Sequence, residues 1–127
     1  NLSSTSYVDS WLSLRITPQS ITSKIYVIVN QQVRLFQTSN TDIGVGLRLM
    51  RDATAVFSPV TSYDNYLLAF PSSDHRYRIP LNYLDSPATT SAVIYKTQAS
   101  GYYPVNGAIV LQDNANPSNI TLMEIAG

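Results

Sequence analysis

Few side chains of this chain could carry nucleophilic or acid–base chemistry. His75, in "SSDHRYRI", is the single histidine, and the sequence contains no cysteine. Acyl transfer requires a nucleophile, a base and a group that orients the base. In an extended segment Asp74 would point away from His75, because successive side chains of a strand alternate sides. We therefore interpret His75 as a solvated loop residue, assign no catalytic residue and predict that the protein is not an enzyme.

Glycoside hydrolysis stays open as a secondary hypothesis. That reaction requires two carboxylates at a set separation, one of them with a raised pKa. No spacing in the sequence brings two acidic residues together, and most of them lie in turn-like contexts. The eight candidates are Asp9, Asp42, Asp52, Asp64, Asp74, Asp85, Asp113 and Glu124.

Metal and nucleotide sites find no support in the residue spacing. One histidine and scattered aspartates lack the pattern of a zinc site or an EF-hand. "DIGVGL", residues 42–47, contains a lone Gly-x-Gly motif, which a phosphate-binding loop would follow with a helix. Strand-like residues follow instead, so we interpret the motif as a turn. We expect no metal, no cofactor and no nucleotide.

Tyrosines in turn-like segments are the positive candidates for a binding site. Sugars are held by aromatic faces together with a few polar groups, and tyrosine is common in rigid recognition surfaces. The alternative is that half or more of the nine tyrosines pack against the core with their hydroxyls at its edge. The predicted receptor-binding residues are Tyr63, Tyr66, Tyr77, Tyr102 and Tyr103.

Charge and length limit the classes of partner. Eight basic residues balance eight acidic ones, so no net field attracts nucleic acid or an anionic membrane. No apolar run approaches the roughly 20 residues of a membrane-spanning helix, and we expect no membrane insertion. The 127 residues fit a single domain, 1–127. Because the chain begins at Asn1 rather than Met, we expect it to be the end of a longer protein.

Short apolar or alternating runs between clusters of Ser, Thr, Asn, Asp, Gly and Pro predict an all-β fold. About ten strands with tight turns and no helical crossovers favour an antiparallel β-sandwich or jelly roll. The expected strands are Trp11 to Ile16, Lys24 to Gln31, Val33 to Gln37, Val45 to Met50, Ala55 to Phe57, Tyr66 to Phe70, Tyr77 to Leu81, Ser91 to Thr97, Ala108 to Gln112 and Ile120 to Ile125.

Several of these strands are apolar on both sides. In "KIYVIVNQ", Ile25 and Val27 point one way while Tyr26 and Ile28 point the other. An antiparallel sandwich in water normally has one polar face per strand, so the second apolar face needs a cover. We infer an oligomer; the alternative is that long loops cover these strands.

Glu124, the only glutamate, alternates onto the same side of the last strand as Ile120 and Leu122. If that side is buried, the carboxylate needs an arginine or backbone N–H groups as partners. The alternative is a strand end in water. Four residues are predicted to lie in a trimer interface or to be buried and polar: Tyr26, Ile28, Arg15 and Glu124.

Three segments, in this order, carry a resemblance to a known family. "WLSLRITPQSITSKIYVIV" contains the turn Ile16–Lys24, "LDSPATTSAVIYKTQ" combines Asp85–Thr89 with Tyr95-Lys96, and the chain closes with "ITLMEI", residues 120–125. Together they resemble the C-terminal knob domain of tailed-bacteriophage tail fibres and tail needles. The segment from Phe57 to Tyr83 has no counterpart in that pattern, so receptor preference does not transfer.

The resemblance implies a homotrimeric, TNF-like β-sandwich knob at the distal end of a fibre or needle. It implies that the protein belongs to the virion, in the phage tail, and acts outside the cell in attachment or entry. The expected partners are two further copies of the chain and a host cell-surface polysaccharide or envelope protein. The alternatives are a carbohydrate-binding or polysaccharide-degrading module and a purely structural trimerisation domain.

Overall fold

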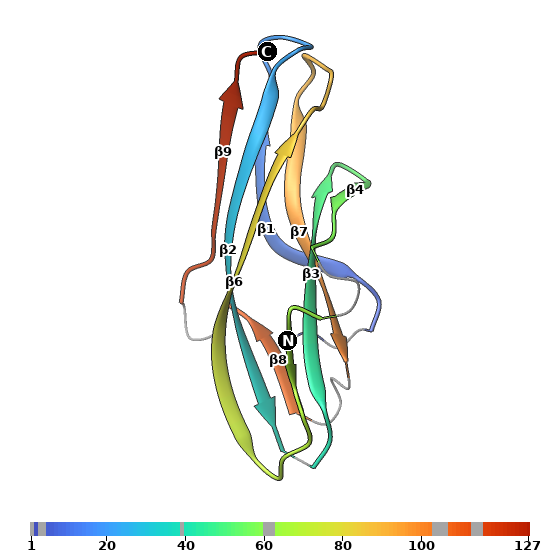
Figure 1. Ribbon diagram of the computed structural model, residues 1–127, viewed down its shortest axis with the longest axis vertical. Coiled ribbons are helices and arrows are strands. Elements are labelled where there is room, and N and C mark those ends of the chain that lie inside the picture. The colour runs from blue at the N-terminus through green and yellow to red at the C-terminus, as the bar shows by residue number, and fades with distance from the viewer. Residues whose placement is uncertain (1, 3–4, 39, 60–62, 103–106, 113–115) are drawn as a thin grey trace.

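Two antiparallel sheets packed face to face make up the computed structural model (Figure 1). It describes residues 2, 5–38, 40–59, 63–102, 107–112 and 116–127, and in these the regular structure is all strand, which confirms the predicted β-sandwich. None of the described residues forms a helix that could cross a membrane. The strands are β1 (Val8–Ile16), β2 (Lys24–Gln37), β3 (Ile43–Arg51), β4 (Thr54–Phe57), β5 (Asn65–Leu67), β6 (Ser73–Asp85), β7 (Val93–Tyr102), β8 (Gly107–Leu111) and β9 (Asn119–Ile125).

The first sheet has the strand order β1-β7-β3-β4, and β5 also pairs with β3. The second sheet has the order β6-β2-β8, and β9 also pairs with β2. β6 pairs with β2 along almost all of its length, from Ile25 opposite Asp85 to Gln37 opposite Ser73. On the other edge of β2, β9 and β8 follow one another, which Figure 1 shows clearly. The long strand β2 therefore organises the whole second sheet.

The sequence predicts two strands where the structure has the single strand β2. Gln31 and Gln32 suggest a break, yet the side chain of Gln31 is buried between the sheets. Its amide is satisfied there: the Thr97 hydroxyl donates to Gln31 Oε1 at 3.0 Å, and Gln31 Nε2 donates to Ser118 Oγ at 3.1 Å. Because both polar ends have partners, the strand continues through the core without an unpaired group.

Two other expectations are wrong in detail. The predicted strand Tyr66 to Phe70 is only Asn65–Leu67, because the Ala69 N–H donates to the Asp42 carboxylate at 2.7 Å instead of to a neighbouring strand. His75 lies in strand β6 and not in a loop; it is exposed and pairs with Leu35 of β2. β6 begins with four polar residues, 73–76, so apolar alternation does not indicate the start of this strand.

The core lies between the inward faces of the two sheets. In β2 every second residue from Ile25 to Gln37 is buried, as expected for a strand with one face against a partner sheet, and in β3 all residues except Arg48 and Arg51 are buried. Burial of this kind supplies the main stabilisation of the fold. The largest buried side chains include Tyr95, Ile25, Leu35, Ile43, Leu47, Leu49 and Ile109.

A buried polar contact joins the sheets at the segment "LDSPATTSAVIYKTQ". Arg51 Nη1, on β3, donates to Asp85 Oδ1 at 2.8 Å and to Oδ2 at 2.6 Å. The Tyr95 hydroxyl, on β7, donates to the same Oδ2 at 2.6 Å. Asp85 belongs to β6, so one carboxylate of the second sheet holds two strands of the first. We call Arg51, Asp85 and Tyr95 the inter-sheet triad.

The first and last motifs of the chain also meet. Glu124 is half-buried and lies on the same side of β9 as the partly buried Ile120 and Leu122. Its Oε2 accepts a hydrogen bond at 2.7 Å from the backbone N–H of Gln19, next to the buried Pro18. The carboxylate therefore ties the turn between β1 and β2 to the last strand.

Candidate functional site

Three of the predicted tyrosines gather on the outer face of the first sheet. The ring centroids of Tyr63 and Tyr66 lie 5.7 Å apart, and each of these rings lies 5.6 Å from the ring of Tyr102. All three pairs are tilted, a geometry that aromatic rings prefer over a direct face-to-face stack. We call Tyr63, Tyr66 and Tyr102 the tyrosine cluster.

Gly44 makes the tyrosine cluster possible. Ile43 and Val45 of β3 point into the core, so position 44 faces outward. Gly44 pairs with Tyr66 of β5 on one side and with Tyr102 of β7 on the other. A Cβ at this position would lie 2.7 Å from Tyr66 Cδ2 and 3.1 Å from Tyr63 Cγ. The missing side chain therefore leaves space for the rings of Tyr63 and Tyr66, which in turn contact the ring of Tyr102.

This placement corrects the interpretation of "DIGVGL" as a turn. Both glycines lie inside strand β3, and the rings of Tyr63 and Tyr66 pack over Gly44. A glycine inside a strand often marks a close approach of another group. Here the group that approaches is a pair of tyrosine rings.

Asp42 holds Tyr66 in place. The Tyr66 hydroxyl donates to Asp42 Oδ2 at 2.7 Å, and the other carboxylate oxygen of Asp42 accepts the Ala69 N–H. The hydrogen bond to Asp42 raises the pKa of Tyr66 above its ordinary value, so the hydroxyl stays protonated. Tyr66 is nevertheless 42% exposed, which leaves part of its ring free to contact a ligand.

Asp64 fixes the segment between Tyr63 and Tyr66 against β3. Its Oδ2 accepts the Leu47 N–H at 2.7 Å, and its own N–H donates to the Val45 carbonyl at 2.9 Å. Burial raises the pKa of Asp64, and the hydrogen bond from Leu47 only partly offsets this effect. Asp64 therefore has a structural task beside the tyrosine cluster.

Asp64→Asn is expected to raise the melting temperature at pH 7 by a few degrees. A raised folded-state pKa means that stability is full at low pH and falls as the pH rises through that pKa. Asparagine cannot ionise, yet it keeps an oxygen that accepts the Leu47 N–H. The difference in melting temperature between variant and wild type should disappear as the pH falls toward about 4, the ordinary pKa of aspartate. Thermal unfolding at a series of pH values tests this, and a gap independent of pH would contradict it.

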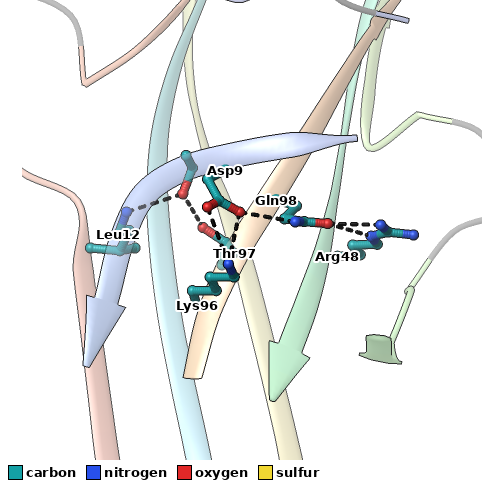
Figure 2. A network of polar contacts seen from close by, with 7 residues as sticks. Asp9, Leu12, Arg48, Lys96, Thr97 and Gln98 are labelled. Carbon is teal, nitrogen blue, oxygen red and sulfur yellow. Dashed lines mark hydrogen bonds and ion pairs between the residues drawn. The ribbon is translucent and has the colours of Figure 1, made fainter. Parts of the chain in front are cut away.

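A chain of polar contacts crosses the same outer face and is drawn in Figure 2. Gln98 Nε2 donates to Asp9 Oδ1 at 2.9 Å, and Gln98 Oε1 accepts from Arg48 Nη2 at 2.7 Å. Lys96 Nζ lies 3.1 Å from the Asp9 carboxylate, and the Arg48 guanidinium lies 4.1 Å from the centre of the Tyr7 ring. The outer face of the first sheet thus combines aromatic rings with fixed donors and acceptors.

No protein-family model matches this chain, and no curated protein does. The resemblance of its motifs to phage knobs therefore stays an expectation, and the functional interpretation depends on the side chains themselves.

Tyr77, another of the predicted receptor residues, does not join the tyrosine cluster. Tyr77 lies on the core side of β6, packs against the core and stacks on His75 with 5.9 Å between the ring centroids. Tyr77 therefore fits the alternative interpretation of the tyrosines, in which they pack against the core and do not bind a receptor. Tyr103 lies outside the described residues. Among the described residues, no group of three potential metal ligands comes together.

The predicted interface residues lie on opposite sheets. Tyr26 and Ile28 are half-buried on the outer face of β2. Arg15 lies on β1, opposite Ile94 of β7, and both are exposed on the outer face of the first sheet. Only the two residues of β2 therefore belong to an apolar outer surface.

The sequence analysis did not predict the role of Gly44 under the tyrosine rings, the hydrogen bond from Tyr66 to Asp42 or the contacts of Arg48 with Gln98. For Gly44, the available signal was a glycine between strand-forming residues. The partners of Asp42 and Arg48 come from distant segments, so no spacing in the sequence indicates them.

Proposed function

We propose that this domain is a binding module that attaches to bacterial cell-surface polysaccharide through the tyrosine cluster. The observation that carries the proposal is the meeting of Tyr63, Tyr66 and Tyr102 over Gly44. Aromatic rings supply large contact area for the apolar face of a sugar at a low cost in side-chain entropy. Asp42 and the exposed edge of Tyr66 add polar groups beside the rings.

The motif resemblance supports the setting of this activity: the distal knob of a phage tail fibre or tail needle, with a jelly-roll or TNF-like topology. In that setting the domain would cap the fibre and contact the host during attachment or entry. Fold alone does not decide a function, so the tyrosine cluster carries the proposal and the resemblance supplies its context.

The proposed homotrimer would use the outer face of the second sheet. Tyr26 of β2 pairs with Leu84 of β6 on one side and with Met123 of β9 on the other, which places three apolar side chains in one row. Leu84 is 45% exposed and Met123 is 49% exposed. An exposed apolar row of this kind favours burial against another protein surface. In a closed ring of identical chains, every copy buries its row and none stays exposed. Three copies would also multiply weak sugar contacts through effective concentration.

Tyr66→Ala is expected to weaken binding to a bacterial surface polysaccharide about tenfold or more, which corresponds to roughly 1.4 kcal/mol. The test is biolayer interferometry against immobilised lipopolysaccharides and capsular polysaccharides. Tyr66→Phe keeps the ring and loses only the Asp42 hydrogen bond, so it should stay within about threefold of wild type. Phe70→Ala removes an exposed aromatic residue outside the tyrosine cluster and serves as the control.

Two results would contradict the proposed function. One is that no polysaccharide binds the wild-type protein at all, which would favour a purely structural trimerisation domain. The other is that Phe70→Ala and Tyr66→Ala weaken binding equally, which would locate the contact elsewhere.

Leu84→Glu is expected to convert a trimer into a monomer, because a glutamate in the apolar row would be buried without a partner. Light scattering across a dilution series measures this directly. We expect three times the chain mass of 14.0 kDa for the wild type and one chain mass for the variant. Ile94→Glu changes an exposed residue of the first sheet and should leave the mass unchanged. A wild-type protein that stays monomeric at high concentration would rule out the trimer.

A further inference from the structure

Trp11 combines a largely exposed side chain with a left-handed backbone conformation. It is 90% exposed, the highest value among the exposed large hydrophobic residues described. Its φ of 68° lies in the left-handed region, which non-glycine residues rarely adopt. Because the indole ring is exposed, it contributes little burial energy to the fold at this position. Glycine would adopt the same positive φ without strain. Packing therefore does not explain why a tryptophan stands here.

The segments on both sides hold Trp11 in this conformation. The pairing of β1 with β7 shifts between Asp9 and Ser13, so Trp11 lies in a β-bulge. Next to it, the Leu12 N–H donates to Ser10 Oγ, and Ser10 and Thr97 hydroxyls are hydrogen-bonded to each other. Figure 2 shows these contacts at the bend of β1. Because Thr97 donates to the buried Gln31, the bulge is anchored in the core, and the strain at position 11 is held by its surroundings.

A small cavity lies beside this bulge. It has a volume of 170 Å³, and Leu2, Val8 and Leu111 contribute its apolar wall together with Trp11. A second residue of its lining, Gln112, also has a left-handed backbone, with φ of 63°. Strained residues cluster at ligand sites more often than elsewhere, and two of them meet here. Pockets for drug-sized ligands measure roughly 300–1,000 Å³, so this one suits a single small unit.

The polar groups of the cavity select the class of ligand. Asp9 and Gln112 belong to its lining. The Asp9 carboxylate can accept hydrogen bonds from hydroxyl groups, and the Gln112 amide can both accept and donate them. Hydrogen bonds from Gln98 and Lys96 hold the pKa of Asp9 below its ordinary value, so it is a carboxylate at neutral pH. Lys96, 3.1 Å away, balances that charge. A neutral ligand with several hydroxyls and one apolar face fits this combination better than an anion or a hydrocarbon.

We propose that Trp11 and the cavity beside it form a binding site for one neutral pyranose unit, stacked on the indole ring and hydrogen-bonded to Asp9 and Gln112. The proposal goes beyond the function proposed above, because it assigns a separate site that uses no residue of the tyrosine cluster and does not require self-association. If no pyranose binds at Trp11, the function proposed for the tyrosine cluster still stands. If the tyrosine cluster binds no polysaccharide, the proposal for the Trp11 site still stands.

The single tryptophan of the chain provides a direct readout. Tryptophan emission is recorded at constant protein concentration while methyl α-glucoside, methyl α-galactoside or methyl α-mannoside is added, with glycerol as the control polyol. We expect a saturable blue shift with at least one glycoside and none with glycerol. A ligand of about a dozen non-hydrogen atoms should bind in the millimolar range. No shift with any of the three glycosides would overturn the proposal.

Two variants separate binding from structure. Trp11→Gly removes the ring and relaxes the backbone, so it should melt at or above the wild-type temperature while saturation-transfer NMR signals of the glycoside disappear. Trp11→Phe keeps an aromatic face and should retain part of the signal. Trp11→Gly melting well below wild type would give Trp11 a structural role and overturn the proposal. So would an emission maximum that moves with protein concentration but with no glycoside, since a second copy would then cover Trp11.

Discussion

Asp85→Ala is expected to lower the free energy of unfolding by about 3 kcal/mol, because the variant leaves the Arg51 guanidinium and the Tyr95 hydroxyl without their shared acceptor. Tyr95 is buried, so its hydroxyl cannot turn to bulk water, whereas the Arg51 side chain is 25% exposed and recovers part of its hydration. Urea unfolding measures the difference.

The surface ion pair of Arg34 and Asp74 offers a matched control for the inter-sheet triad. Arg34 Nη2 lies 2.8 Å from Asp74 Oδ2, but the Asp74 side chain is 37% exposed. Exposed pairs contribute about 1 kcal/mol or less, so Asp74→Ala should change stability far less than Asp85→Ala does. Equal losses in the two variants would contradict the structural role assigned to the triad.

Gly44→Val is expected to reduce polysaccharide binding more than tenfold while the sandwich stays folded. The valine side chain would occupy the space in which Tyr63 and Tyr66 lie, since even a single Cβ approaches Tyr66 to 2.7 Å. The rings face outward and can swing into solvent, so we expect a cost in unfolding free energy of only about 1–3 kcal/mol. Binding to the polysaccharide and urea unfolding, measured on the same samples, separate the two effects.

Ala55→Val controls for added volume in the same sheet, because Ala55 is exposed on β4. It should leave both binding and stability near wild type. If Gly44→Val binds as well as wild type, the tyrosine cluster does not contact the ligand.

The sandwich could be predicted because its signals are local. Turn residues such as Pro18 and Asp85 bound apolar runs, and alternation along each run distinguishes an inner from an outer face. The same alternation puts Tyr26 and Ile28 on one side of β2, opposite Ile25, and puts Glu124 on the side of Ile120 and Leu122, and the structure has the same alternation. Properties that depend on one strand at a time are therefore visible in the sequence.

The binding surface could be predicted only in part, because it depends on strand register. Turn-like context singles out Tyr63, Tyr66 and Tyr102, but only the pairing of Gly44 with both neighbours brings them together. Tyr77 has a similar context and lies on the core side of β6 instead. Register decides which residues of neighbouring strands lie opposite one another, and sequence spacing does not give that register.

The bulge at Trp11 was hidden for a related reason. "YVDSWLSLRI" alternates too poorly to reveal where β1 departs from regular pairing. The bulge follows from the contact between Ser10 and Thr97, which are 87 positions apart in the chain. No local signal marks such a contact.

The most direct test of the tyrosine cluster is an NMR footprint of the bound polysaccharide. Protein with isotope-labelled tyrosine rings is titrated with a surface polysaccharide that binds in interferometry, and the ring signals are followed one by one. We predict that Tyr63, Tyr66 and Tyr102 shift together, while Tyr77 and the buried Tyr95 do not. Shifts confined to other tyrosines, or to none, would contradict the proposed function.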